Sequence, residues 1–518
     1  MEKLTNFING KFALPNSDQY LDIFEPATGQ VYAQVSDSNS DDVENAIHSA
    51  QSAFKNWSGK SVEERADYLN KIADGIETRL DEFAEHESRD TGKPISLAKT
   101  VDIPRAISNF RFFAEYGQSF NFEQELTSEV SFNKIVRSPL GVVGCISPWN
   151  LPLYLFSWKI APALIAGNTV VAKPSEITPY TAFKLGEVCQ DAGLPPGVLN
   201  IIHGQGNTAG DALVSHPKIK AISFTGGTAT GKLIAAKTAS SFKKLSLEMG
   251  GKNPAVIFAD CDYDNMLETV VLSSFSNQGQ ICLCSSRILV EDSIYEKFKN
   301  DFVRRVSELK VGDPSNEETQ FGALSSMGHF EKVLEYIEIA KQEGGKVLTG
   351  GNAIKINGRC ETGWFVEPTV IDELDNSCRT NQEEIFGPVV TLMPFNTDEE
   401  GIELANGIDY GLSATIWTED NEKANRVSAQ IDAGVIWVNC WLVRDLRTPF
   451  GGMKQSGLGR EGGDEALRFF TEIGRAHVRT PVTSLPRMPS SARKNKPIPG
   501  HRHSLPLPGP RSASTLPC

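Results

Sequence analysis

The chain contains 518 residues, of which 40% are hydrophobic and 22% charged. This composition is ordinary for a folded protein and excludes wholesale disorder, collagen-like repeats and a small disulfide scaffold. The formal net charge is −14, but the segment 475–518 holds eight Lys or Arg and no acid, so residues 1–474 carry 43 basic against 65 acidic residues. A nucleic-acid surface needs a basic stripe, so no nucleic-acid partner is expected.

The sequence predicts neither a membrane span nor secretion. The longest nearly apolar stretch, residues 160–172, is interrupted by Asn168 and is shorter than the ~20 residues of a spanning helix. The N-terminal sequence MEKLTNFING lacks the apolar region of a signal peptide. Nine scattered cysteines without a CxxC pair indicate free thiols. We therefore expect a cytoplasmic protein that does not contact a membrane.

The first 120 residues begin with short strand-like runs, FINGKF and YLDIFEP, and continue as helices. Asp41 and Glu44 have the spacing of a capping box at a helix start. Apolar residues then recur every three or four positions from Val43 to Trp57, which predicts an amphipathic helix. Further helical patterning covers residues 61–91 and 102–116.

From about residue 140 the pattern changes to alternating strands and helices. The β-branched runs are GVVGCIS, NTVVAKPS, GVLNIIHG, KAISFTG and NPAVIFAD. Helical stretches such as 178–192 separate several of them, which is typical of βαβ units in a parallel sheet. A second α/β stretch covers residues 249–445, so the fold class is α/β.

The segment 474–518 differs from everything before it. It holds nine of the 28 prolines, many Ser and Arg residues, and no periodicity, which predicts a disordered tail. The run IGRAHVRTPVT, followed by RMPSSA, resembles a translated sequencing adapter. On this interpretation the natural sequence is lost near Ile473 and the tail is an artefact; the alternative is a genuine basic linker.

Two segments have features of a nucleotide site. Gly226 and Gly227 follow the strand AISFT and open a helix, whose N-terminal N–H groups could hold a phosphate. The segment nearly matches the ATP-binding P-loop, but Leu233 has no hydroxyl for Mg²⁺. Lys173 and Glu176 lie where a strand ends, and such a carboxylate can accept both hydroxyls of an adenosine ribose. An ordinary turn and a solvated loop are the alternatives.

Three further residues could carry chemistry. Cys282 follows a Gly and a Gln, which suggest a turn with a polar surface, and an exposed thiolate there would be a strong nucleophile if its pKa is lowered. Glu248 precedes two glycines, where a mobile carboxylate could act as a base, and Asn150 lies in a loop fixed by prolines, where its amide could donate to an oxyanion. A buried Cys, a surface Glu and a turn Asn are the alternatives. Neither GxSxG nor HExxH is present, and no metal site is expected.

Taken together, these segments resemble the aldehyde dehydrogenase superfamily over about residues 1–473. The matches stand in order: SPWNLP, NTVVAKPSE, GLPPGVLNII, SFTGGTATG, LEMGGKNP, FSNQGQIC, EEIFGPV and TPFGGMKQSGLGREGG. The resemblance implies a Rossmann-like NAD-binding domain, an α/β catalytic domain and a small β oligomerisation flap. The expected ranges are 1–120 and 140–248 for NAD binding, 249–445 for catalysis, and 121–139 and 446–473 for oligomerisation.

The resemblance also implies residue roles. Cys282 matches the nucleophile, Glu248 the general base that releases a free acid, and Asn150 the oxyanion amide. Residues that match NAD contacts are Trp149, Lys173, Glu176, Gly226, Gly227, Glu384 and Phe386. Gly227 departs from the family, because many members have Ser there.

The substrate is indicated by two segments, DIPRAISNFRFFA and NCWLVRDLRTPFGG. They are similar to the family members that oxidise 2-aminomuconic semialdehyde in tryptophan and 2-nitrobenzoate catabolism, and to the 2-hydroxymuconic semialdehyde enzymes. That resemblance implies that Arg105 and Arg444 bind the substrate carboxylate, with Arg111 and Arg447 as rivals. The alternatives are 2-hydroxymuconic semialdehyde or a neutral aldehyde such as retinal or betaine aldehyde. The resemblance to the family also implies that the chain forms a homodimer or a homotetramer.

Two interpretations from other classes remain open. One is an ATP-dependent enzyme that uses the near-P-loop at residues 226–233. The other is a catalytically silent protein on the same scaffold, against which the retention of both Cys282 and Glu248 argues.

Overall fold

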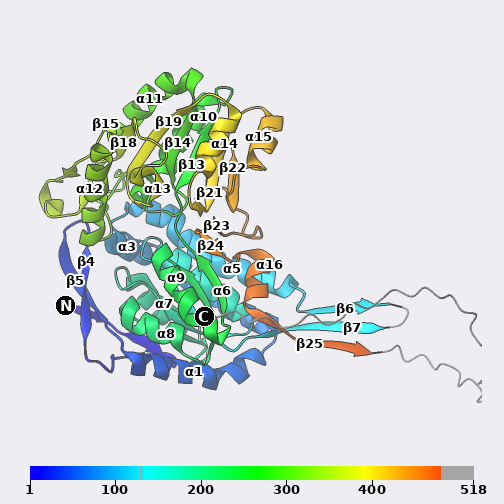
Figure 1. Ribbon diagram of the computed structural model, residues 1–518. Helices are drawn as coiled ribbons and strands as arrows, with labels where there is room; N and C mark the ends of the chain where they lie inside the picture. Colours follow the sequence, from blue (N-terminus) through cyan, green and yellow to red (C-terminus); the bar gives the residue numbers. More distant parts are fainter. Residues whose placement is uncertain (129–130, 480–518) are drawn as a thin grey trace, which may run out of the picture.

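Two sheets of mostly parallel strands organise the chain in the computed structural model, which describes residues 1–128 and 131–479 (Figure 1). The first sheet contains β2 (Asn6–Ile8), β3 (Lys11–Ala13), β8 (Val142–Ile146), β9 (Thr169–Lys173), β10 (Leu199–Ile201), β11 (Ile219–Thr225), β12 (Lys244–Glu248) and β24 (Gly457–Leu458). Their order is β24-β12-β11-β8-β9-β10-β2-β3, and β12, β11, β8, β9 and β10 are mutually parallel. This is the parallel α/β arrangement that the sequence predicts.

The second sheet has seven strands. They are β13 (Asn253–Ile257), β14 (Ser285–Glu291), β15 (Lys346–Thr349), β18 (Thr369–Asp372), β19 (Val389–Phe395), β21 (Ser413–Trp417) and β22 (Val435–Val438). The order is β15-β18-β19-β14-β13-β21-β22, and only β15 is antiparallel to its neighbour. Every residue of β9 and of β13 is buried, because helices cover both faces of a parallel sheet.

Helices flank both sheets. Around the first lie α1 (Ser40–Ser58), α2 (Val62–Glu77), α3 (Leu80–Thr91), α4 (Ile95–Leu97), α5 (Ile103–Ser119), α6 (Pro152–Ile165), α7 (Tyr180–Asp191), α8 (Asp211–Ser215), α9 (Thr228–Thr238) and α16 (Gly463–Phe469). Around the second lie α10 (Tyr263–Phe275), α11 (Asp292–Ser307), α12 (Met327–Gln342), α13 (Arg379–Gln382), α14 (Asp398–Asn406) and α15 (Asn421–Ser428). Among the described residues, no helix has the length and apolar character needed to cross a bilayer.

Smaller sheets complete the fold. One joins β1 (Glu2–Leu4), β5 (Gln30–Ser36) and β4 (Tyr20–Glu25), and two pairs join β16 (Ala353–Ile354) with β17 (Phe365–Val366) and β20 (Tyr410–Gly411) with β23 (Met453–Lys454).

The expected helices form, but the first one begins differently from the prediction. Its N-cap is Asn39, which forms a capping box with Asp42, so the box predicted at Asp41 and Glu44 is wrong by two residues. Asp42 is the acidic member of the capping box because its carboxylate also accepts a hydrogen bond of 2.9 Å from the backbone N–H of Asn16 and is therefore held in place. The pattern over 61–91 divides into α2 and α3, and the pattern over 102–116 becomes α5.

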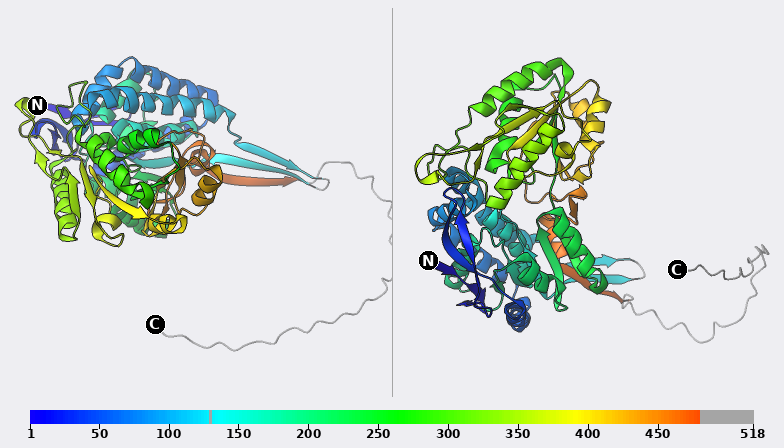
Figure 2. Two further views of the ribbon diagram at one scale, coloured as in Figure 1. Left: turned by 90° about the horizontal axis from the view of Figure 1, so that it is seen from above. Right: turned by 60° about the vertical axis from the view of Figure 1, so that its left-hand side comes forward.

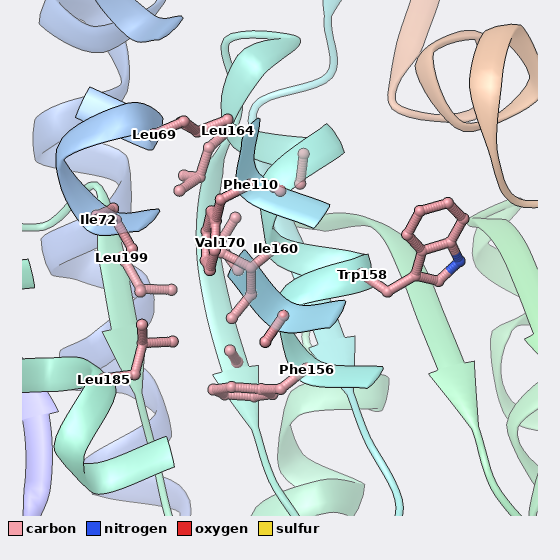
Figure 3. Close-up of a cluster of buried hydrophobic side chains, with 14 of the residues drawn as sticks. Leu69, Ile72, Phe110, Phe156, Trp158, Ile160, Leu164, Val170, Leu185 and Leu199 are labelled. Atoms are coloured by element: carbon pink, nitrogen blue, oxygen red, sulfur yellow. The ribbon is translucent and has the colours of Figure 1, made fainter. Parts of the chain in front are cut away.

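The core of the first domain surrounds α6, whose residues are nearly all buried. Figure 3 shows Phe156, Ile160 and Leu164 of this helix lying among side chains from α2, α5, α7, β9 and β10. Trp158 lies apart from them on another side of the helix. The packing therefore fixes α6, and with it the loop that precedes it, which carries Asn150.

A three-stranded arm extends away from both domains (Figures 1 and 2). It contains β6 (Glu123–Thr127), β7 (Phe132–Pro139) and β25 (Thr471–Arg479), with β7 in the centre. The pairing of β25 with β7 runs from Thr471 opposite Pro139 to Arg479 opposite Phe132. The prediction of a disordered tail is therefore wrong for residues 474–479, which complete the ladder; residues 480–518 lie outside the described residues.

Residues 446–470, which the sequence analysis grouped with 121–139 for oligomerisation, lie outside the arm; their part in assembly stays a prediction. Within this range β24 pairs antiparallel with β12 and fills an edge of the first sheet. Helix α16 then contacts α6. The pairing of β24 satisfies backbone donors and acceptors at the edge of β12 that would otherwise be unpaired beside the site.

Candidate active site

The predicted nucleotide residues gather because the strands that carry them are parallel neighbours. Lys173 at the end of β9 lies opposite Ile146 at the end of β8, and Glu248 at the end of β12 lies opposite Thr225 at the end of β11. The segment with Trp149 and Asn150 follows β8 directly, and Gly226 follows β11. Ligands of open α/β sheets bind at such carboxyl ends.

The second sheet faces this edge with its opposite end. Cys282 lies just before β14, and Glu384 and Phe386 lie just before β19. Gly250 and Gly251 connect β12 of the first sheet to β13 of the second. The carboxyl edge of one sheet and the amino edge of the other therefore enclose the site between the two domains.

Two cavities meet at Cys282. The first, of about 260 Å³, is lined by Trp149, Asn150, Gly226, Gly227, Glu384 and Phe386. The second, of about 290 Å³, is lined mostly by apolar side chains and by Glu248, Glu461 and Arg444. Cys282, Leu155, Thr225 and Met249 line both. A group bound in either cavity can therefore reach the same sulfur.

Cys282 is partly buried, and its thiol lies where the two cavities meet. Burial raises its pKa, and the carboxyl groups of Glu384 and Glu248 raise it further. The surroundings therefore do not lower the pKa of this thiol, because the apolar cavity wall disfavours a charge. The Asn253 amide donates to the Cys282 carbonyl at 2.7 Å, so the main chain at the sulfur is fixed.

Glu248 is buried at the end of β12 and is not the mobile residue that its glycine neighbours suggest. Only 4% of it is exposed, and neither carboxyl oxygen has a hydrogen-bond partner. Its pKa is raised well above the usual range by burial and then by the charge of Glu461. The Lys159 ammonium contacts that same Glu461 carboxylate at 2.8 Å. A carboxyl group in this environment can hold a proton or, once ionised, remove one.

Asn150 is also buried and held. Its side-chain amide donates one hydrogen bond, of 2.8 Å, to the carbonyl of Gln280 in the loop before Cys282. An amide nitrogen carries two hydrogens, so one remains for an oxygen in the first cavity.

The remaining NAD candidates divide into two groups. Lys173 and Glu176 contact each other at 3.1 Å and line neither cavity that reaches Cys282. Glu384 lines the first cavity, where its carboxylate accepts from the backbone N–H of Gly251 at 2.9 Å. The structure thus separates the Lys173–Glu176 pair, in which Lys173 is buried and Glu176 partly exposed, from the inner carboxylate of Glu384.

The start of α9 has room for a phosphate. The N-cap is Gly227, and no side chain caps the helix. A Cβ at Gly227 would meet nothing within 4 Å, so the space left by the missing Ser is open. Uncapped N–H groups beside open space are suited to an anionic diphosphate.

Helix α12 contributes two residues to the first cavity that the sequence analysis missed. Lys332 donates to the Glu384 carbonyl at 3.0 Å, and the His329 ring contacts the Phe386 carbonyl at 2.7 Å. The His329 ring also lies 5.0 Å from the ring of Trp149. No motif marks them, because their three-residue spacing only places them on one helix face.

Arg444 lies inside the second cavity between two aromatic rings. Its guanidinium carbon is 4.4 Å from the ring centres of both Trp158 and Phe450, and one nitrogen donates to the Tyr154 hydroxyl at 3.2 Å. The buried Nε and Nη2 have no partner. Two unpaired cationic donors in an apolar cavity are a site for an anionic group.

The other arginines differ in position. Arg105 lies 5.9 Å from the Tyr154 ring but does not line the cavity. Arg111 contacts Asp74 and Glu77, and Arg447 contacts Asp445; all of these are exposed pairs. The structure therefore places both rivals outside the site, where they form ordinary surface ion pairs.

The fold and the site define an α/β enzyme in which a cysteine lies where a nucleotide-type cavity meets an apolar one. The sequence profile of the aldehyde dehydrogenase family matches residues 12–475. The chain belongs to this family and is an oxidoreductase that acts on aldehyde groups. No group of three His, Cys, Asp or Glu residues within 1–128 and 131–479 could hold a metal ion.

Relatives of the chain include muconic semialdehyde enzymes. The 2-aminomuconic semialdehyde dehydrogenase of Danio rerio is 50% identical over 479 residues, which cover 92% of this chain and 98% of the relative. The 2-hydroxymuconic semialdehyde dehydrogenase of Pseudomonas sp. strain CF600 is 46% identical over 479 residues, covering 91% and 99%. A crystal structure of Staphylococcus aureus betaine aldehyde dehydrogenase with NAD⁺ superimposes with a TM-score of 0.88 at 36% identity, covering 92% and 94%. The family and the aldehyde dehydrogenase fold predicted from the sequence are confirmed.

Proposed function

We propose that this chain oxidises 2-aminomuconate 6-semialdehyde to 2-aminomuconate with NAD⁺. The relatives support the substrate, since 2-aminomuconic semialdehyde dehydrogenases are about half identical to the chain over nearly its whole length. The related structure with bound NAD⁺ supports the coenzyme. When bound, NAD⁺ accepts a hydride from the aldehyde carbon.

The chain's own residues divide the chemistry among them. Cys282, which both cavities share, is the nucleophile that forms a covalent bond to the aldehyde carbon. The free amide hydrogen of Asn150 stabilises the oxygen that gains charge in this attack. Once the carbon bound to Cys282 has lost its hydride to NAD⁺, it would be the acyl carbon of a thioester. Glu248 removes a proton from water, whose oxygen attacks that carbon, and the Cys282 sulfur leaves as the free acid is released.

The residues expected to bind NAD⁺ offer donors for its diphosphate and acceptors for its ribose hydroxyls. The uncapped start of α9, with Gly226 and Gly227 before it, suits the diphosphate. Glu384 accepts hydrogen bonds from the hydroxyls of one ribose, and Trp149 and Phe386 line the cavity beside it. Lys173 and Glu176 bind the hydroxyls of the adenosine ribose.

The unpaired guanidinium donors of Arg444 in the apolar cavity are the observation that favours a substrate with a carboxylate. A neutral aldehyde would leave its two buried donors unpaired, and an unmade hydrogen bond of a charged group is costly. A carboxylate at the far end of the substrate supplies the acceptors and the opposite charge. Arg105 is the second proposed carboxylate contact; its guanidinium carbon lies 5.9 Å from the ring of Tyr154, which lines the cavity.

The test compares Arg444→Met with Arg447→Met, a matched control three residues away. Each variant is assayed with 2-hydroxymuconate semialdehyde and with hexa-2,4-dienal, a neutral aldehyde of the same carbon number. Loss of a bidentate charge-assisted contact of about 2–3 kcal/mol lowers kcat/KM for the anionic substrate by about 30–150-fold. We expect the neutral substrate to be much less affected and the control to behave as wild type. An equal loss on both substrates would refute carboxylate binding by Arg444.

The two muconic semialdehydes differ in a single substituent, and both have the carboxylate that Arg444 would bind. Measuring kcat/KM for both compounds under the same conditions decides which is the better substrate. A kcat/KM for hexa-2,4-dienal or betaine aldehyde that exceeds both would favour a neutral substrate instead.

The arm supports assembly of this chain with further copies of itself. Every residue of β6 is exposed, and β6 pairs on one side only, so its other edge is open. A homodimer or homotetramer would cover such an edge. Light scattering of the purified chain gives the number of subunits, and a monomer would contradict this assignment.

A further inference from the structure

A buried lysine outside the predicted site contacts the main chain of Asn150, the proposed oxyanion residue. Lys93 follows the end of α3, and its side chain is fully buried. Its ammonium forms an ion pair with Asp102 and donates a 3.1 Å hydrogen bond to the main-chain carbonyl of Asn150. Asp102 lines the same apolar cavity as Arg444. Lys93 therefore connects the wall of the substrate cavity to the residue that would hold the reacting oxygen.

Two carboxyl groups lie beside the Lys93 ammonium. Asp102 contacts it directly, and Glu87 lies 4.0 Å away. Burial raises the pKa of Glu87 to about 8 and also raises the pKa of Asp102, while the charge of Lys93 lowers both. One oxygen of Glu87 has no hydrogen-bond partner, so the nearer Asp102 is the main anchor of the ammonium. Breaking a buried ion pair by removing one partner alone is strongly destabilising.

The turn that carries Lys93 is fastened to the cysteine loop by separate hydrogen bonds. The Gln278 side chain donates to the Gly92 carbonyl at 3.1 Å, and the Ser325 hydroxyl donates to the Thr91 carbonyl at 3.1 Å. Ser325 also donates through its backbone N–H to the Gln280 side chain. The base of the lysine side chain is therefore fixed relative to the second domain.

The carbonyl of Asn150 receives a second donor from the cysteine loop. The Asn277 amide donates to it at 3.0 Å. Asn277 and Gln278 both have left-handed backbone angles, with φ of 50° and 57°. Two adjacent non-glycine residues in this region are strained and need surrounding contacts to persist. Lys93 and Asn277 together hold the Asn150 main chain, while its side chain points to Gln280 and the cavity.

We propose that Lys93 is a positioning residue for the Asn150 amide, with Asp102 anchoring the ammonium. The proposal rests on the proposed oxyanion role of Asn150 and goes beyond it. Lys93 lines neither cavity that reaches Cys282, so it acts on the reaction only through the main chain that it holds. A displacement of about 1 Å at a catalytic group can slow a reaction by ~10²-fold.

The main test is the variant Lys93→Met/Asp102→Asn, which removes both charges of the direct ion pair together. The measurement is the single-turnover rate of NADH formation with hexanal at saturating NAD⁺. We expect a loss of about 10–100-fold relative to wild type. Lys184→Met, which removes a mostly buried lysine paired with Glu82 and Glu187 outside the site, is the matched control and keeps the wild-type rate.

A double-mutant cycle with Asn150→Ala distinguishes positioning from general damage. Asn150→Ala alone is expected to lose about 10²–10³-fold, and adding the Lys93 and Asp102 changes is expected to cost little more. We expect the rate of Cys282 alkylation by iodoacetamide and the Kd for NAD⁺ to stay within about twofold of wild type. A variant whose fold is generally destabilised would change both values. Lys93→Gln, whose donor is one bond shorter, is the second variant if the first does not fold.

The outcomes are separable. A wild-type rate in the Lys93 variants, or a loss that multiplies in full with that of Asn150→Ala, overturns the positioning role and leaves the proposed function intact. A wild-type rate in Asn150→Ala overturns the oxyanion role itself and this inference with it.

Discussion

The glycine between the two domains offers a sharp test of the coenzyme site. A Cβ at Gly250 would lie 2.0 Å from Oε2 and 2.3 Å from Oε1 of Glu384. Non-bonded contacts below 3.0 Å are strongly repulsive, so Gly250→Ala moves this carboxylate by about 1 Å or more. The backbone of Gly250 does not have a positive φ, so alanine itself causes no backbone strain.

The size of the effect follows from what the displaced carboxylate loses. Glu384 accepts a 2.9 Å hydrogen bond from the backbone N–H of Gly251. A hydrogen bond to a charged group contributes about 1.5–3 kcal/mol, which corresponds to a factor of about 10–150. Because Glu384 is the proposed ribose acceptor, we expect the KM for NAD⁺ to rise by about this factor, with a much smaller change in KM for the aldehyde.

The assay is steady-state kinetics with NAD⁺ as the varied substrate, followed by NADH absorbance. Gly328→Ala is the control, since a Cβ there meets nothing within 4 Å. An unchanged KM for NAD⁺ in Gly250→Ala, with Gly328→Ala also normal, would refute the role of Glu384.

Three further predictions concern protons in the second cavity. Glu248→Gln should give one burst of NADH and then stall, because the thioester no longer has a base to activate water; steady turnover would contradict the assigned role. Burial raises the pKa of the Cys282 thiol and of the Glu248 carboxyl, and both act deprotonated, so kcat/KM for a neutral aldehyde, which reports the attack by Cys282, and kcat, where hydrolysis limits it, should both rise with pH from about 6.5 to about 9.5; flat profiles would contradict this. The charge of Glu461 also raises the pKa of Glu248, so Glu461→Gln should move the rise of kcat to lower pH, and a shift upward would refute that coupling.

Local sequence was sufficient for the elements of the proposed coenzyme site. The strand that ends at Lys173 and the glycine turn after the strand AISFT were both predicted, and the structure places them at one sheet edge, on either side of β8. Strand ends and glycine turns depend on residues close together in the chain. The arm was predicted less well: β25 continues to Arg479, because its ladder with β7 satisfies backbone groups whatever the side chains are.

The protonation states could not be predicted in the same way. The sequence indicated a polar turn at Cys282 and a mobile carboxylate at Glu248, whereas Cys282 is partly buried and Glu248 is buried, and both line one cavity. A pKa depends on how much water and charge surround a group, and the surrounding residues come from every part of the chain.

Short segments of the amino-acid sequence were enough to predict the family, the alternation of strands and helices, and the cysteine that follows a polar turn. Folding was needed to show that Arg444, and not Arg111 or Arg447, faces an apolar cavity with unpaired donors, and that the Lys93 ammonium contacts the Asn150 carbonyl. Desolvation and long-range hydrogen bonds arise only when residues far apart in the chain, such as Lys93 and Asn150 at 57 positions, are packed together.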